Sequence, residues 1–197
     1  MISCTRCGTV HVFKYSSSAV GLCTQCQYTV SDETTNLVPY RSFPIPQEYC
    51  LDLLNKEVSL GHIKGVITGK LRYFYTEGYL NKWAFCFSGQ HLWLCESLGT
   101  YFLLKPSQVG RFASDLKPGD AVSHDQTNYT VDAIHKALGY SLEGETPHFD
   151  TYFSAFDSIE CSMDNEILMI HRSNAGQEIF FTGSHIDFHD IKPLLTK

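Results

Sequence analysis

Residues 1–26 read MISCTRCGTVHVFKYSSSAVGLCTQC and contain two Cys-x-x-Cys pairs, Cys4 with Cys7 and Cys23 with Cys26. Fifteen residues separate the pairs, and this spacing is typical of a four-thiolate zinc site. Four soft thiolates without histidine or carboxylate suit a tetrahedral Zn²⁺ ion. Such a site leaves no position open for water or substrate, so its role is to fold the segment that holds it. The four cysteines are therefore predicted to bind one structural zinc ion.

The residues between the two pairs are consistent with this prediction. Thr9–Tyr15 alternates as a strand does, 16–18 is a serine turn, and 19–22 leads back to the second pair. Gly8 supplies the backbone freedom that a tight metal knuckle needs. We therefore expect residues 1–31 to form a zinc ribbon. An iron–sulfur cluster or a pair of disulfides stays open as an alternative use of the four cysteines.

Composition places the whole chain among folded globular proteins. It has 197 residues, of which 43% are hydrophobic and 13% aromatic, enough for one medium domain or two small ones. No stretch approaches the roughly 18–20 apolar residues of a membrane helix. Only three residues precede Cys4, which leaves no room for a secretory signal. Zinc thiolates persist in a reducing compartment, so we expect a cytoplasmic protein.

Beyond the ribbon the chain changes character twice. Residues 32–46 are polar and then proline-rich, which indicates an extended linker. Residues 47–197 are expected to form a β-rich domain, with short helical turns at 47–55 and at 106–115.

The strand pattern is clearest where aromatic residues alternate. Trp83, Phe85 and Phe87 alternate, a Gly-containing turn follows, and residues 91–96 and 100–104 continue as strands, which predicts a meander of three strands. The aromatic face of this meander needs a second sheet or a closed barrel to cover it.

Later runs extend the antiparallel pattern. Glu166–His171 and Glu178–Thr182 are expected to pair as a hairpin. No helix long enough for a β-α-β crossover appears between the strands, which favours antiparallel pairing. The predicted fold class is therefore mainly β, with a small zinc ribbon and an antiparallel β-barrel or β-sandwich domain.

A weak internal repeat is also predicted. Residues 129–134 are similar in character to 65–71, about sixty-five positions earlier, and a turn at 116–120 opens the second stretch. We therefore expect two similar halves, about 47–111 and 112–197.

Residues 83–104 resemble a bacterial family known as domain of unknown function 4178. The resemblance rests on Trp83 at the start of one strand, on the Trp93-Leu94 pair followed by acidic Glu96, and on the run Tyr101–Leu104. It implies a β-rich fold, often preceded in that family by a zinc ribbon, and a bacterial origin. It implies no established reaction.

The resemblance covers about residues 50–190 and includes the later stretches 129–131 and 142–145. One departure concerns Phe85 and Cys86, which stand where members of the family often have an acidic residue and a tyrosine. If that acid has a polar role in the family, this chain lacks it.

Basic and acidic residues are distributed unevenly along the chain. Residues 1–111 hold ten Lys or Arg against seven Asp or Glu, and residues 112–197 hold five against fourteen. The acidic half would repel a phosphate backbone, which disfavours nucleic-acid binding. Opposite charges on the two halves favour a protein partner or self-association. Nucleic-acid binding predicts instead one basic surface formed by six side chains: Arg6, Lys14, Arg41, Lys64, Lys70 and Arg72.

The sequence contains no complete catalytic motif. Gly65–Leu71 is one residue short of a phosphate-binding loop and has Leu71 in place of the Ser or Thr that holds magnesium. His185 and His189 would share one face of a helix and form a second metal site if a third ligand were near. No catalytic or cofactor-binding residue is assigned.

Four cysteines outside the ribbon lack any paired spacing: Cys50, Cys86, Cys95 and Cys161. Cys86 and Cys95 would face each other across a hairpin, and in a reducing cell both are expected to be small apolar core groups. Cys161 with one of the nine histidines is a nucleophile to be tested against the structure.

These observations favour a non-catalytic, zinc-binding adaptor whose β domain recognises a protein partner. Two alternatives stay open: an enzyme with its site in the β domain, and nucleic-acid binding through the ribbon and the basic first half.

Overall fold

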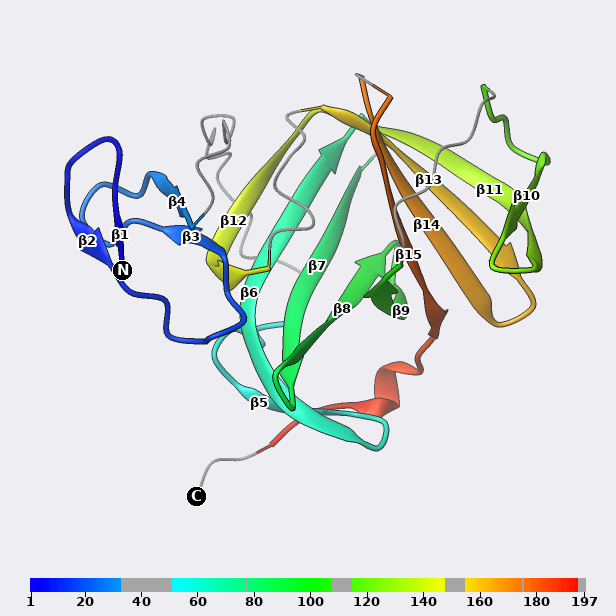
Figure 1. Cartoon of the computed structure of the whole chain (residues 1–197). Coiled ribbons are helices and arrows are strands. Elements are labelled where there is room, and N and C mark those ends of the chain that lie inside the picture. The colour runs from blue at the N-terminus through cyan, green and yellow to red at the C-terminus, as the bar shows by residue number, and fades with distance from the viewer. Residues whose placement is uncertain (33–50, 77, 108–114, 148–154, 175, 195–197) are drawn as a thin grey trace.

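The computed structural model describes residues 1–32, 51–76, 78–107, 115–147, 155–174 and 176–194 (Figure 1). Strands dominate this part of the chain, and its only helical element is the short 3-10 turn η2 (Phe188–Asp190). The fold is mainly β, as predicted. The expected linker at 32–46 lies outside the described residues except for Asp32.

Sixteen strands are described. Four belong to the N-terminal lobe: β1 (Ile2–Ser3), β2 (Val10–His11), β3 (Val20–Leu22) and β4 (Thr29–Ser31). The others form the body: β5 (Glu57–Leu60), β6 (Ile63–Tyr75), β7 (Gly78–Phe87), β8 (Gln90–Ser97), β9 (Thr100–Pro106), β10 (Ala121–His124), β11 (Thr127–Ala137), β12 (Gly139–Thr146), β13 (Phe156–Met163), β14 (Glu166–Ser173), β15 (Glu178–His185) and β16 (Ile191–Pro193).

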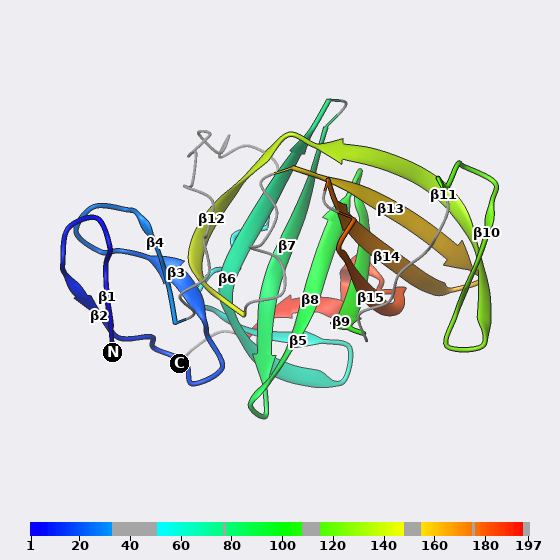
Figure 2. The ribbon, with the colours of Figure 1, turned by 45° about the horizontal axis from the view of Figure 1, so that its top comes forward.

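The body is one curled antiparallel sheet. Apart from the separate β1-β2 pair, fourteen strands join in the order β10-β11-β13-β14-β15-β9-β8-β7-β6-β12-β3-β4, with β5 on β6 and β16 on β5. Strand β12 follows β11 after Leu138 alone, yet it pairs with β6 on the other side of this order. The chain from β11 to β12 therefore closes the sheet on itself (Figure 2). Gly69 permits this contact, because a side chain there would overlap the backbone of Glu145.

The predicted strand pairings are confirmed. Strands β7, β8 and β9 form the three-stranded meander, and β14 pairs with β15 as the later hairpin. The described parts of the two expected helical turns are not helical: residues 51–55 contain no helix, and Pro106 is the last residue of β9. A proline is tolerated at a strand end, where its missing N–H is not needed. Residues 47–50 and 108–114 lie outside the described residues.

The two halves repeat the same pairing at a fixed offset. The backbone N–H of Ile67 donates to the carbonyl of Lys56, and that of Val131 donates to the carbonyl of Asp120, sixty-four positions later in each case. A bulge follows directly after Ile67 in β6 and after Val131 in β11. The similarity of residues 129–134 to 65–71 predicted a repeat. The matching hydrogen bonds and bulges show that the two halves repeat in structure as well.

A local twofold relation joins the halves. Following the register from strand to strand makes Leu103 of β9 equivalent to Phe180 of β15, and hence Lys105 equivalent to Thr182. Lys105 and Thr182 lie opposite each other where β9 and β15 pair antiparallel. Each half therefore presents the same edge strand to the other, as two subunits do in a symmetric dimer.

The apolar core follows this symmetry. One cluster lies in the first half, around Ile67, Trp83 and Leu94, and a second lies at equivalent positions of the other half, around Val131 and Ile170. The largest cluster lies between the halves and includes Trp93, Cys95 and Phe181. Both tryptophans are fully buried, so they are core residues, as predicted.

The N-terminal lobe is hydrogen-bonded to the body. Strand β3 pairs with β12, and the carboxylate of Glu145 on β12 accepts hydrogen bonds from the backbone N–H of Lys14 (2.8 Å) and of Tyr15 (3.3 Å). Ala19 and Val20 pack in the central cluster. The lobe thus extends the sheet of the body and shares part of its core.

Candidate metal centre

The two Cys-x-x-Cys pairs form matching backbone knuckles. In the first, the N–H of Gly8 donates to the carbonyl of Cys4, and in the second the N–H of Gln27 donates to the carbonyl of Cys23, each at 2.9 Å. Gly8 and Gln27 both have left-handed backbone angles, with φ of 74° and 58°. The predicted role of Gly8 is therefore confirmed, and Gln27 adopts the same conformation without glycine's freedom.

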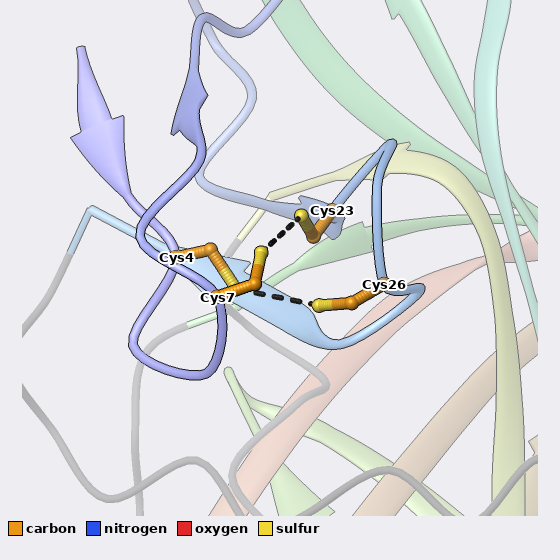
Figure 3. Close-up of side chains that lie close together, drawn as sticks. All are labelled: Cys4, Cys7, Cys23 and Cys26. Atoms are coloured by element: carbon orange, nitrogen blue, oxygen red, sulfur yellow. Dashed lines mark hydrogen bonds between the residues drawn. The ribbon is translucent and has the colours of Figure 1, made fainter.

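The knuckles bring all four thiols together (Figure 3). The Sγ atoms of Cys4, Cys7, Cys23 and Cys26 lie within 4.8 Å of one another. The Cys4–Cys26 and Cys7–Cys23 distances are both 3.6 Å. Four sulfurs at about 2.3 Å from one zinc ion stand about 3.8 Å apart in a tetrahedron. The arrangement therefore fits a single metal ion, and each of the four thiols is free of a disulfide.

Burial of the thiols is uneven. Cys4 and Cys23 are buried and form a small core with Val30, whereas Cys7 is exposed and Cys26 is half-buried. This core is small, so a bound ion would supply much of the stability of the lobe.

The pKa values of two of the thiols are shifted in opposite directions. Hydrogen bonding to Thr9, through its side chain and then its backbone, lowers the pKa of Cys7 to about 6. The Thr9 hydroxyl lies 3.2 Å from the Cys7 sulfur. Desolvation is the main cause that raises the pKa of Cys26 to about 12. At pH 7 the metal-free site thus contains the Cys7 thiolate and the Cys26 thiol.

We expect metal affinity to rise with pH. A metal binds thiolates, so binding at pH 7 must release at least the Cys26 proton. One released proton lowers the apparent dissociation constant about tenfold per pH unit. Competition against a metal-binding dye between about pH 6.5 and 8, corrected for the dye's own protonation, measures this slope. A dissociation constant that does not change with pH would contradict the expected proton release.

The knuckles predict opposite effects for two substitutions. Gln27→Gly should stabilise the metal-loaded protein by about 1 kcal/mol, because glycine removes the left-handed strain. Gly8→Ala should destabilise it by a similar amount, and by no more, since nothing lies within 4 Å of the added methyl group. Urea unfolding of the metal-loaded variants measures both. Equal signs for the two changes would show that the backbone angles do not control these knuckles.

The second metal site that was considered for His185 and His189 is not found among the described residues. His185 ends β15 and His189 lies in η2, where Asp187 caps the turn by accepting a hydrogen bond from the His189 N–H (2.8 Å). The two histidines therefore do not share a helix face. Within the described residues, the four ribbon cysteines are the only group of three or more metal-binding side chains that come together.

The other cysteines are not arranged for catalysis. Cys86 lies opposite His91 across the β7-β8 hairpin, so it does not face Cys95 as expected. Cys95 is buried in the central cluster, as predicted. Burial raises the pKa of Cys161 to about 12, which keeps its thiol protonated and poorly nucleophilic. Cys50 lies outside the described residues.

One serine–histidine pair was not anticipated. Ser107 Oγ lies 2.9 Å from His124 Nε2, and the His124 ring stacks on Phe180. The Asp125 carboxylate lies 3.5 Å from the same Nε2, whereas a catalytic triad places its acid on Nδ1. The pair is therefore hydrogen-bonded but not oriented as a nucleophile and base. The two residues are seventeen positions apart in the chain, and no local sequence signal predicts their contact.

Two of the six side chains that nucleic-acid binding would place on one basic surface are buried. Lys70 and Arg72 are 5% and 1% exposed, so they cannot contact a phosphate backbone. Arg41 lies outside the described residues. The β pattern of residues 64–75 indicated a strand but not that its charged side chains point inward.

Arg72 belongs to a buried polar chain that sequence reasoning missed. Its Nε donates to Asn81 Oδ1 (2.7 Å), and Asn81 Nδ2 donates to Glu96 Oε2 (2.5 Å). All three side chains are at most 7% exposed. They occupy successive cross-strand positions on β6, β7 and β8. Buried charges that are paired in this way are usually structural.

No described helix has the length and apolar character needed to cross a membrane. Comparisons with protein-family models, with curated proteins and with solved structures find no match to this chain.

Proposed function

We propose that this chain is a non-catalytic zinc-binding adaptor of the cytoplasm, in which zinc folds the N-terminal ribbon and the β domain recognises a protein partner. The observation that supports it most is the cluster of four thiols within 4.8 Å of one another. With four protein ligands a tetrahedral ion has no position left for substrate.

Zinc fits this donor set better than other ions. Thiolates are soft ligands, and four of them in tetrahedral geometry favour Zn²⁺ or iron. In a cluster of two or four irons the thiolates bind different metal atoms and are spread around the cluster. Sulfur separations of 3.6 Å across both knuckle pairs favour a single ion.

Exposed apolar side chains support a partner surface on the β domain. Leu98, in the turn before β9, is 85% exposed, and Phe188 is 51% exposed. The Phe188 ring lies 5.6 Å from that of Tyr101 at the start of β9, which places both exposed side chains at the same end of this strand. Apolar groups gathered at one exposed place favour contact with another protein.

Membership of the family known as domain of unknown function 4178 is part of the same proposal. Its support is that the residues carrying the resemblance, from Trp83 to Leu104, lie on the three adjacent strands β7, β8 and β9.

Cobalt substitution tests whether the metal site is closed. Cobalt(II) in place of zinc should give the visible absorption of tetrahedral thiolate coordination, and added cyanide should leave that spectrum unchanged. A spectral shift with cyanide would reveal an open coordination position, and the enzyme alternative would then replace the adaptor.

A further inference from the structure

Glu145 of β12 joins the body to two separate segments of the N-terminal lobe. Its backbone lies opposite Gly21 of β3, where β3 runs beside β12 (Figure 2). Its carboxylate accepts hydrogen bonds from the N–H of Lys14 through both oxygens (2.8 and 3.0 Å) and from the N–H of Tyr15 (3.3 Å). One residue of the body therefore holds both the strand before the second knuckle and the loop between the two knuckles.

Both of these segments lead directly to the thiols. Strand β3 ends one residue before the buried Cys23. Phe13, which precedes Lys14, packs against the small core that contains Cys4 and Cys23. A side chain added at Gly21 would lie 3.2 Å from the Phe13 ring, so β3 and the loop also pack closely on each other. The contacts of Glu145 therefore reach the metal centre through the backbone on either side of it.

The body fixes Glu145 from its other side. The hydroxyl of Thr68, in the bulge of β6, donates a hydrogen bond to the Glu145 carbonyl (2.9 Å). Gly144 has a left-handed backbone, with φ of 69°, and a side chain there would overlap the carbonyl of Thr68. The missing side chain of Gly69 admits the Glu145 backbone. Residues of the body thus set the position of the carboxylate.

This arrangement links docking of the lobe to metal binding. Four sulfurs reach one ion only when the two knuckles stand at a fixed separation. Docking on Glu145 favours that separation, because it holds the segment that joins the knuckles. Hydrogen bonds to a charged acceptor are stronger than neutral ones, and any contact that favours the binding-competent arrangement raises the apparent affinity for the metal.

We propose that Glu145 is a positioning residue of the metal centre, which raises metal affinity by holding the loop between the knuckles against β12. By linkage, the bound metal strengthens docking of the lobe on β12 by the same factor. Loss of the metal then loosens the lobe from the body. This inference rests on the proposed zinc site and extends it to a residue of the β domain.

Zinc affinity of the full-length chain, measured by competition with a chromophoric chelator, tests the proposal. Glu145→Ala removes every acceptor and should weaken zinc binding about tenfold or more. Glu145→Gln keeps one carbonyl oxygen and the shape of the side chain, so it should weaken binding by less, about threefold. At saturating zinc, the amides of Lys14 and Tyr15 should exchange faster in Glu145→Ala, while those of β7 to β9 keep their wild-type rates.

Glu143→Ala is the matched control. It makes the same charge change two residues earlier on β12, opposite Lys70 of β6, and should keep the wild-type zinc affinity. Glu145→Gln decides the case if the alanine variant does not fold. Wild-type affinity in both Glu145 variants, or an equal loss in Glu143→Ala, would overturn the inference and leave the four-thiolate site intact. A wild-type chain that binds no zinc would overturn the zinc site itself and this inference with it.

Discussion

Replacing one buried cysteine of the proposed zinc site, in Cys23→Ser, should abolish metal binding and unfold the ribbon. Cys23 is fully buried and its sulfur lies 3.6 Å from that of Cys7, so serine would present a hard, protonated oxygen to a thiolate site. Structural zinc contributes on the order of 10–16 kcal/mol of binding free energy in isolated zinc-finger peptides. The small core of Val30 and the cysteines cannot replace that contribution.

The effect on the body should be smaller but measurable. Ribbon unfolding would remove Val20, which is fully buried, from the central cluster, and burial of a valine contributes about 1.5–3 kcal/mol. The rest of the central cluster comes from strands of the body. Hydrogen exchange should therefore show fast amides in β1 to β4 and retained protection in β6 to β9.

Cys86→Ser is the matched control, because Cys86 is half-buried and lies outside the cluster. It should keep one metal per chain by elemental analysis, while Cys23→Ser should keep none. If Cys23→Ser retained a full equivalent of metal and a protected ribbon, the four thiols would not be the ligand set.

Trp93→Ala should cost the body about 3–5 kcal/mol of unfolding free energy. Trp93 is fully buried between the two halves, where it contacts the central cluster and lies 4.8 Å from the buried Lys82 ammonium. Truncation to alanine leaves a cavity that neither half can fill by local movement. Urea unfolding followed by far-ultraviolet circular dichroism measures the loss.

Leu98→Ala is the control for Trp93→Ala. Leu98 is 85% exposed, so its truncation should change the free energy of unfolding by less than about 0.5 kcal/mol. A cost below about 1 kcal/mol for Trp93→Ala would mean that the central cluster does not hold the halves together.

Local sequence patterns predicted three features of the structure: the cysteine cluster, the three-stranded meander and the repeat of the two halves. The cysteine spacing predicted that the four thiols would come together, and the alternation of Trp83, Phe85 and Phe87 predicted β7 and its meander. The resemblance of residues 129–134 to 65–71 predicted the repeat. The two stretches belong to the equivalent strands β11 and β6, and each strand contains a bulge at the same position. Each of these signals is a pattern within short stretches of sequence and requires no knowledge of how the chain packs.

Features that depend on distant contacts could not be predicted in this way. The sequence assigned Lys70 and Arg72 to a candidate basic surface, but long-range packing buries them. The closure of the sheet depends on β12 reaching β6, whose paired residues Leu142 and Leu71 are far apart in the chain. The Ser107–His124 contact arises for the same reason. Burial and long-range pairing are properties of the folded chain and not of any one segment.

X-ray absorption at the zinc edge, together with elemental analysis of the purified chain, tests the central claim most directly. The four clustered thiols predict one zinc ion per chain with four sulfur neighbours at about 2.3 Å. A chain that binds no zinc, or zinc with oxygen or nitrogen among its nearest neighbours, would contradict the structural four-thiolate site and the adaptor function that depends on it.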